Sequence, residues 1–261
     1  VKVQCDYLPL INFAIQQNGA SVIHQLSIEN TTPAPLKDIQ VQITTEPTFG
    51  NAAPIVVEQI PANSSICLSS FNLTLSANYF TQLTERLSGN LKIEITSEAV
   101  SVFSQTYPID ILAYDQWGGI NVLPEMLAAF ITPNHTAILP IIKRAASILG
   151  QWTDNPSLDE YQSRTPDRVR KQMAAIYTAI TEQQIIYSTI PASFEEYGQR
   201  VRLANSVMAQ KLGTCLDMAL LYASCLEAIG LNALIIITQG HAFAGAWLVP
   251  ETFPDPTIDD V

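Results

Sequence analysis

Apolar and polar residues alternate with a period of two along much of the first 110 or so residues. Such alternation is typical of β-strands that bury one face. It is clearest in residues 22–29, 39–44 and 91–96. The positions that we expect to form the apolar faces of these strands are Val22, His24, Leu26, Ile28, Ile39, Val41, Ile43, Leu91, Ile93 and Ile95.

Turn-forming runs separate these strands at residues 30–35, 46–47, 61–63 and 88–90. One helix is predicted over residues 77–87, with Ser76 as its N-cap and Gly89 as its stop. About seven strands in about 110 residues is the size of an immunoglobulin-like or fibronectin-like β-sandwich. We therefore expect residues 1–113 to form an all-β, immunoglobulin-like domain.

After residues 114–119 the apolar period becomes that of helices. We expect a first helical stretch over residues 126–131 and a second over residues 138–149 that ends at Gly150. A third begins at Thr165-Pro166-Asp167, an N-cap, a proline at the first helical position and an acidic residue. Residues 114–261 are thus predicted to form a second domain, of helices followed by α+β structure.

The chain is acidic and apolar: 13 Lys and Arg stand against 24 Asp and Glu, and 48% of the 261 residues are hydrophobic. This balance argues against the basic surface that a nucleic-acid binder needs. No run of 18 apolar residues is long enough to cross a bilayer. The basic cluster at Arg164, Arg168, Arg170 and Lys171 is interpreted as a solvated helix face that pairs with nearby acids, with an anion or nucleic-acid patch as the alternative.

Four scattered cysteines and three histidines show no metal-ligand spacing, so we expect no metal and no cofactor in this segment. Cysteines used this sparingly favour a reducing, cytoplasmic location. A Cys5–Cys67 disulfide and glycosylation at four N-x-[ST] matches would apply only to a secreted chain. The absence of an initiating Met and the polar final residues suggest the front part of a longer protein, whose second domain is truncated at its C-terminus.

The segment at residues 211–230 carries the candidate chemistry. Gly213 and Thr214 form a turn with a capping residue, and an apolar helix follows until Gly230. Cys215 therefore lies at the start of a helix, where unpaired N–H groups and the helix dipole favour a thiolate. The same N–H groups are able to bind an oxyanion.

Two strands are expected after this helix. Residues 231–238 form a buried strand, Gln239-Gly240 a turn, and residues 241–248 a second strand that begins with His241. A thiol nucleophile needs a base at hydrogen-bond distance, and the helix–strand–turn–strand path brings His241 toward Cys215. Cys225, His24 and His135 are interpreted as ordinary structural or surface residues.

The Gly213-Thr214-Cys215 turn, the helix that follows, the aliphatic strand and Gly240-His241-Ala242-Phe243 resemble the core of the transglutaminase-like, papain-like superfamily. The resemblance covers about residues 195–250. It implies an α+β fold in which Cys215 is the nucleophile and His241 the base. The substrate would then be a protein or peptide.

The third catalytic residue of that family is an Asp or Asn on the next strand, and here the sequence departs from the pattern. Asp255, Asp259 and Asp260 are the available candidates, but they lie in a proline-rich acidic tail without strand character. Either one of them serves, or the partner lies beyond Val261. Gln210 is a further candidate for an oxyanion role, although its spacing to Cys215 departs by about one residue from the family's.

Residues 114–119, 191–198 and 213–217 also resemble the N-terminal region of large bacterial proteins related to DNA helicases. That resemblance implies ATP and DNA chemistry in downstream domains, because this segment has no G-x-x-x-x-G-K-[ST] motif. Two functions follow as hypotheses. The segment is either a cysteine hydrolase or acyl transferase, or an inactive module that binds a partner or regulates the downstream domains.

Overall fold

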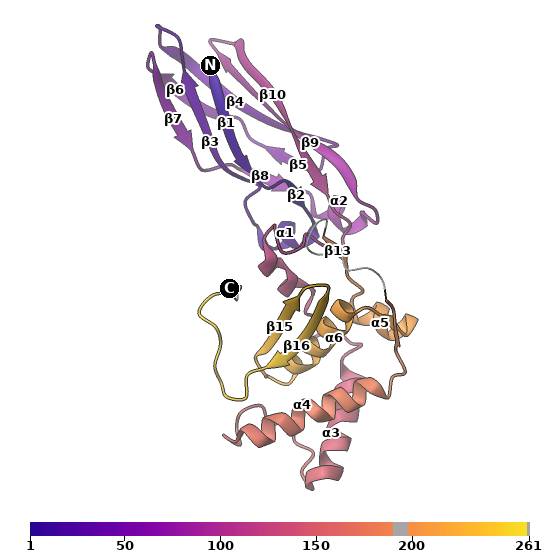
Figure 1. Ribbon diagram of the computed structural model, residues 1–261. Helices are drawn as coiled ribbons and strands as arrows, with labels where there is room; N and C mark the ends of the chain where they lie inside the picture. The colour runs from indigo at the N-terminus through magenta and orange to yellow at the C-terminus, as the bar shows by residue number, and fades with distance from the viewer. Residues whose placement is uncertain (190–197, 260–261) are drawn as a thin grey trace. The chain divides into compact units, whose positions relative to one another are not determined.

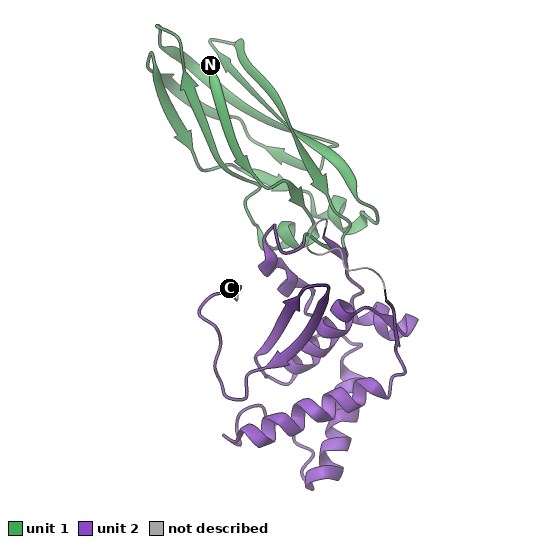
Figure 2. Ribbon diagram, in the orientation of Figure 1, with its two compact units in different colours: residues 1–118 green, residues 119–261 purple. Residues whose placement is uncertain are grey.

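The chain has a mixed α and β structure with many strands, and the computed structural model describes residues 1–189 and 198–259. It divides into two compact units, residues 1–118 and 119–261 (Figures 1 and 2). The division falls between Gly118 and Gly119, directly after the buried Trp117. No helix in the described ranges is long and apolar enough to cross a membrane.

Unit 1 is built mainly from strands. One sheet has the order β2-β10-β9-β4-β6, a second has the order β1-β3-β7, and β5 pairs with β8. The strands are β1 (Lys2–Tyr7), β2 (Leu10–Ile11), β3 (Ile23–Asn30), β4 (Leu36–Glu46), β5 (Gly50–Ala52), β6 (Ile55–Ile60), β7 (Ser64–Leu68), β8 (Leu73–Leu75), β9 (Leu87–Ser97), β10 (Val100–Ile111) and β11 (Gln116–Trp117). Two short helices accompany them, α1 (Phe13–Asn18) and α2 (Ala77–Gln82).

The predicted period-two runs are strands of these sheets. Val41 of β4 lies opposite Ile95 of β9, and both are fully buried. The run at residues 22–29, which forms most of β3, departs from strict alternation. The pairing of β1 with β3 shifts there by one residue, because Asp6 pairs with Gln25 but Tyr7 pairs with Ile23. This irregularity turns His24 to solvent, although we expected it on the apolar face with Leu26.

The predicted helix at residues 77–87 is shorter than expected. The Ser76 side chain accepts a hydrogen bond from the Tyr79 N–H, as a cap should, but α2 ends at Gln82. Gly89 is not a helix stop, because it lies inside β9. A Cβ on Gly89 would come within 2.7 Å of the Ile111 side chain, so close packing between β9 and β10 requires glycine there.

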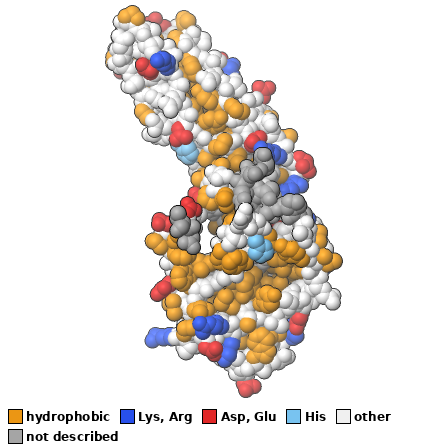
Figure 3. Space-filling view, in the orientation of Figure 1, with side chains coloured by type: hydrophobic (Ala, Val, Ile, Leu, Met, Phe, Trp, Pro, Cys, Tyr) orange, Lys and Arg blue, Asp and Glu red, His pale blue; other side chains and the backbone are white. Residues whose placement is uncertain are grey.

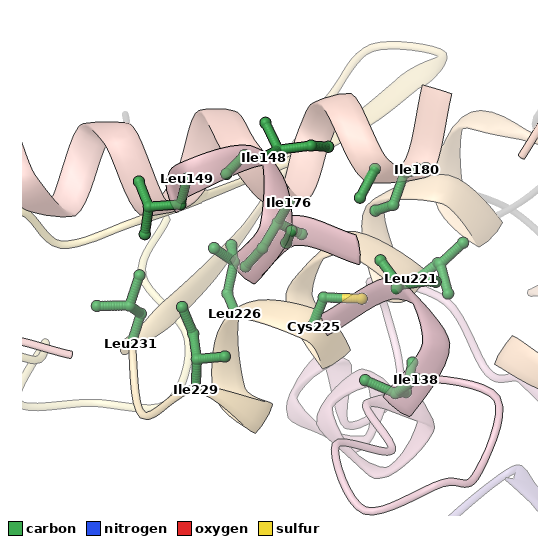
Figure 4. Packing of buried hydrophobic residues seen from close by; sticks show 14 of the residues in the cluster. Ile138, Ile148, Leu149, Ile176, Ile180, Leu221, Cys225, Leu226, Ile229 and Leu231 are labelled. Carbon is green, nitrogen blue, oxygen red and sulfur yellow. The ribbon is translucent and has the colours of Figure 1, made fainter. Parts of the chain in front are cut away.

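Unit 2 combines helices with short strand pairs. Its elements are η1 (Pro124–Phe130), α3 (Leu139–Thr153), α4 (Pro166–Thr181), β12 (Ile186–Tyr187), β13 (Gln199–Arg200), α5 (Ala204–Gln210), β14 (Leu212–Gly213), α6 (Cys215–Ala228), β15 (Ala233–Thr238) and β16 (His241–Ala246). Helices α3, α4 and α6 enclose the core, in which Ile148, Ile176, Leu221 and Leu226 pack together (Figure 4). Leu231, which precedes β15, closes one end of this core.

Three local predictions in unit 2 need correction. The stretch predicted as a helix at residues 126–131 is a 3₁₀ helix, η1. Helix α3 continues through Gly150 to Thr153, since a helical glycine costs only about 1 kcal/mol and packs here against Pro156. Thr165 is the N-cap of α4 by position, but its side chain makes no capping hydrogen bond.

Candidate functional site

The candidate site is organised around the start of α6. Thr214 and Asp217 form a reciprocal capping box: the Asp217 N–H donates to Thr214 Oγ1 at 3.3 Å, and the Thr214 N–H donates to Asp217 Oδ2 at 2.9 Å. These bonds satisfy two N–H groups that a helix start would leave without partners. Cys215 is thereby fixed as the first residue of the helix, as the sequence predicted.

Asp217 also ties the helix to a preceding segment. Its Oδ1 accepts the backbone N–H of Arg202 at 2.8 Å, and its Oδ2 accepts from the Arg202 guanidinium at 3.2 Å. The Asp217 side chain is completely buried, whereas that of Arg202 is 28% exposed. The carboxylate complements the helix dipole, and the Arg202 guanidinium balances its charge.

Sequence reasoning missed both Asp217 and Arg202 as site residues. A signal for Asp217 was present: Thr214 followed three residues later by an acid matches the capping-box pattern. Nothing in the sequence pointed to Arg202, because its partner lies 15 residues away and only the fold brings them together.

Tyr187 is the neighbour of the Cys215 thiol. Strand β12 runs parallel to β14, with Tyr187 opposite Gly213, two residues before Cys215. Burial raises the pKa of the Tyr187 hydroxyl, and the charge of Cys215 and a hydrogen bond with its thiol raise it further. A hydrogen bond from the phenol O–H to sulfur holds the proton on Tyr187 and so raises the Tyr187 pKa in this way. The Tyr187 hydroxyl is therefore the donor and the Cys215 sulfur the acceptor. No local sequence pattern pointed to Tyr187, because its pairing with β14 joins segments far apart in the chain.

His241 lies at the same end of unit 2 as the start of α6. Helix α6 has 14 residues and spans about 21 Å. The chain turns and returns as β15, which has six residues and spans about 20 Å, and both β15 and β16 contact the helix. Because these lengths match, the turn between the two strands lies near the end of α6 at which Cys215 stands.

The side chain of His241, however, lies on the outer face of the β15–β16 hairpin. Ala242 is 2% exposed and faces α6, so its neighbours His241 and Phe243 project from the opposite face. Both are exposed, and their rings stack with centroids 6.4 Å apart. Within the described ranges no hydrogen bond joins His241 to Cys215; its strand partner is Thr238.

The acidic candidates lie in the segment after β16. Asp255 and Asp259 are exposed, and the described part of the chain gives neither a hydrogen bond nor an ion pair. Asp260 lies outside the described residues. Gln210 is exposed at the end of α5. The structure thus brings none of these side chains into hydrogen-bond contact with His241 or Cys215.

The remaining candidates have structural partners. Arg168 pairs with Asp159 at 3.0 Å and Lys171 with Asp167 at 2.7 Å, so the predicted pairing with nearby acids is found at these two residues. The Arg168 side chain is only 11% exposed, however, and is not part of a solvated face. All four cysteines are free thiols, so Cys5 and Cys67 form no disulfide. Among the residues that the structure describes, no group of three or more His, Cys, Asp or Glu side chains is arranged to hold a metal ion.

Comparisons with known proteins give little likeness. No protein-family model matches the chain, and no curated protein matches it. Among solved structures, the crystal structure of the E. coli chaperone DraB is similar over 50% of this chain, with 12% sequence identity and a TM-score of 0.27. The match spans 62% of the DraB chain.

Proposed function

We propose that unit 2 is a cysteine-dependent acyl-group enzyme in which Cys215 is the nucleophile and His241 the acid–base residue. The observation that carries this proposal is the construction of the α6 start: a half-buried thiol held at a capped helix N-terminus, with a phenol hydroxyl beside it. The buried Asp217 carboxylate and its partner Arg202 fix the start of the helix through hydrogen bonds that do not involve the thiol. A thiol at a helix start with a hydrogen-bonding neighbour is an arrangement that suits a cysteine nucleophile.

In the proposed reaction, Cys215 Sγ bonds to the carbonyl carbon of an amide and the C–N bond breaks. The proton held by His241 passes to the departing nitrogen. Water or an amine then attacks the thioester, the C–S bond breaks, and the thiol is regenerated. The N–H groups at the start of α6 that have no partner among the described residues are candidates for stabilising the oxyanion. These steps need no cofactor within this segment.

His241 serves this reaction only if its ring reaches around the end of the hairpin. It is the first residue of β16 and follows the exposed Gly240, whose φ is +69°. In the proposed reaction the side chain leaves its stacking on Phe243 and turns toward the thiol.

We further propose that unit 1 is an immunoglobulin-like sandwich and unit 2 a transglutaminase-like domain. Two sheets with period-two apolar faces support the first assignment, and the order Cys-helix, strand, His-strand supports the second. The parent would be a larger bacterial helicase-related protein in the cytoplasm, where free thiols such as those found here persist. One of Asp255, Asp259 and Asp260, or a residue beyond Val261, would orient His241.

A second candidate function is an inactive interaction module, which the position of His241 favours. The outer face of the hairpin carries His241, Phe243, Ile236 and Leu234, and residues 231–250 contain no charged side chain. Figure 3 shows hydrophobic side chains gathered over this part of unit 2. An apolar, uncharged face of this kind suits contact with a downstream domain or a partner protein.

Alkylation by iodoacetamide distinguishes the two functions. We expect Cys215 to react at pH 7 at least about tenfold faster than Cys67, which is exposed on β7 and serves as the internal control. Mass spectrometry of the cysteine peptides gives both rates in one sample. Equal rates, or an inert Cys215 in folded protein, would overturn the enzymatic proposal.

The base is tested in the same assay. His241→Ala should slow alkylation of Cys215 but leave that of Cys67 unchanged, whereas His24→Ala, an exposed histidine of unit 1, should alter neither rate. A Cys215 rate that is insensitive to His241 would favour the interaction module.

A further inference from the structure

Strand β7 of unit 1 is an edge strand that lacks the protection found on the other edges. It pairs with β3 on one side, and in the described part of the chain no strand pairs with its other side (Figure 1). The opposite edge of the same sheet, β1, carries exposed Lys2 and Asp6. In the five-stranded sheet, the edge strand β6 carries exposed Glu58, and the other edge strand, β2, has only two residues. Exposed charges and short edge strands hinder pairing with other chains.

No charge protects β7. Residues 59–84, which include this strand, contain no charged side chain, and this is the longest uncharged run in the chain. Unit 1 as a whole is acidic, with four Lys and Arg against ten Asp and Glu in residues 1–118. A second copy of the chain is therefore repelled by most of this surface, because like charges oppose each other. At β7 a second copy meets no such repulsion.

The sequence of β7 and of the two residues after it has the same pattern from either end. Residues 64–70 are Ser-Ser-Ile-Cys-Leu-Ser-Ser, with Cys67 at the centre. When two copies of this segment pair antiparallel about a two-fold axis at Cys67, each residue lies opposite one of its own kind. Serine lies opposite serine, Ile66 opposite Leu68, and Cys67 opposite Cys67 of the second copy. This self-complementary pattern indicates that the partner is a second copy of the same strand.

The two faces of β7 agree with such a pairing. Ile66 and Leu68 are half-buried, whereas Ser65 and Cys67 are exposed. The pairs of Ile66 with Leu68 would therefore continue the half-buried face across the axis, and the two cysteines would meet on the exposed face. Residues directly opposite in antiparallel strands have Cα atoms about 4.5 or about 5.5 Å apart. Both distances lie within the range of about 4.4–6.8 Å over which a disulfide forms.

We propose that β7 is a homodimerisation edge, at which two copies of the chain pair antiparallel around Cys67 and join two three-stranded sheets into one. Because only residues 64–70 of each copy take part, the buried area is below that of a standard interface. We therefore expect weak association, with a dissociation constant of about 0.1 mM under reducing conditions. The protein is then mainly monomeric at low micromolar concentration.

Disulfide trapping with oxidised glutathione tests the register. One Cys67 thiolate attacks the glutathione disulfide and releases glutathione, and Cys67 of the second copy then displaces the other glutathione. Two thiols thus lose two protons and two electrons, and one glutathione disulfide is reduced. All proteins in this test carry Cys215→Ser, so that this thiol does not compete, while burial suppresses Cys5 and Cys225. Linked dimer is measured by non-reducing gel electrophoresis.

Cysteines moved along the strand provide the matched controls. In a Cys67→Ser background, Ser65→Cys alone or Ser69→Cys alone should form linked dimer at least about tenfold more slowly than Cys67. The two copies of either residue lie about 13 Å apart along the paired strands, beyond the reach of a disulfide. A mixture of the Ser65→Cys and Ser69→Cys proteins should react within about threefold of Cys67, because these positions lie opposite each other. Equal rates for the single variants and the mixture would overturn the proposal.

Association without a disulfide is measured by sedimentation velocity in reductant, from about 10 µM to about 1 mM protein. Cys67→Asp places two negative charges opposite each other at the axis and should weaken dimerisation at least about tenfold. Cys67→Ser, at the same exposed position, should stay within about threefold of wild type. Hydrogen exchange checks that unit 1 remains folded in both variants. A wild-type protein that stays monomeric over this range, or equal association of the two variants, would overturn the proposal.

Discussion

Buried polar side chains hold connections in both units, and in unit 2 they also hold the start of a long helix. In unit 1, Asn12 caps the short helix α1, and Asn30 binds backbone groups in the connections after β3 and β6. In unit 2, Gln172 and Ser224 likewise bind loop backbone groups. The difference lies at α6, where Thr214 and Asp217 add buried hydrogen bonds at the start of a 14-residue helix.

The four cysteine thiols also differ in their surroundings within each unit. Cys5 of unit 1 and Cys225 of unit 2 lie in apolar surroundings, and burial raises their pKa to about 11 and about 12. Cys67 is exposed on a strand, and Cys215 is the half-buried thiol at a helix start. Each unit thus contains a suppressed thiol and a more accessible one, which makes the four cysteines matched probes of the two environments.

The largest expected effect is on alkylation rates in alkaline solution. At pH 8 the thiolate fraction of Cys225 should be roughly a thousandfold below that of a thiol at its ordinary pKa of 9.0, and that of Cys5 roughly a hundredfold below. Rates should rise tenfold per pH unit until pH reaches each raised pKa. Mass spectrometry from pH 7 to 10 measures this. Rapid labelling of Cys225 in folded protein would break the comparison, and equal labelling in urea is the control.

Removal of the helix anchor comes next. Asp217→Ala leaves the Thr214 N–H without its partner and the Arg202 guanidinium without its counter-charge, so we expect a loss of about 3 kcal/mol of stability in unit 2. The matched control is Asp110→Ala, which breaks the exposed pair with Arg86 in unit 1 and should cost under about 0.5 kcal/mol. Hydrogen exchange in urea reports each unit; a loss confined to unit 1 would contradict the assignment.

The loop anchor of unit 1 should matter somewhat less. Asn30 is fully buried; its amide donates to the carbonyls of Ala34, Ile60 and Pro61, and its oxygen accepts from Thr32. We expect Asn30→Ala to cost about 2 kcal/mol in unit 1 because several buried groups lose their partner. Asn72→Ala, at an exposed position in the same unit, is the control and should be close to neutral. Urea unfolding followed by hydrogen exchange gives both values.

The smallest effect concerns the phenol beside the thiol. Tyr187→Phe removes a hydrogen-bond donor to the Cys215 sulfur, so alkylation of Cys215 at pH 7 should slow by about threefold. Tyr177→Phe alters an exposed tyrosine that packs on Tyr222, and it should leave the rate unchanged. Equal rates of Cys215 alkylation in wild type and Tyr187→Phe would show that the hydroxyl does not act on the thiol.

Local structure was more predictable than the site. The runs at 39–44 and 91–96, the helix from Cys215 and the two strands after it follow from periods of two and 3.6 residues, which depend on neighbouring positions alone. The errors lie where distant packing overrides local preference. Gly89 was predicted to stop a helix but fills a tight position against Ile111, and the strict alternation predicted around His24 is broken by an irregularity in the β1–β3 pairing.

The sequence by itself determined that Cys215 begins a helix and that His241 begins a strand two elements later, because caps, turns and periodicity are encoded by adjacent residues. Only the tertiary structure decided what surrounds them. Tyr187 meets the thiol through pairing of segments far apart in sequence, and Arg202 meets Asp217 through the fold. The face on which His241 lies was likewise decided by Ala242 packing on α6, since a strand's alternation fixes only which residues share a face and packing selects the buried one.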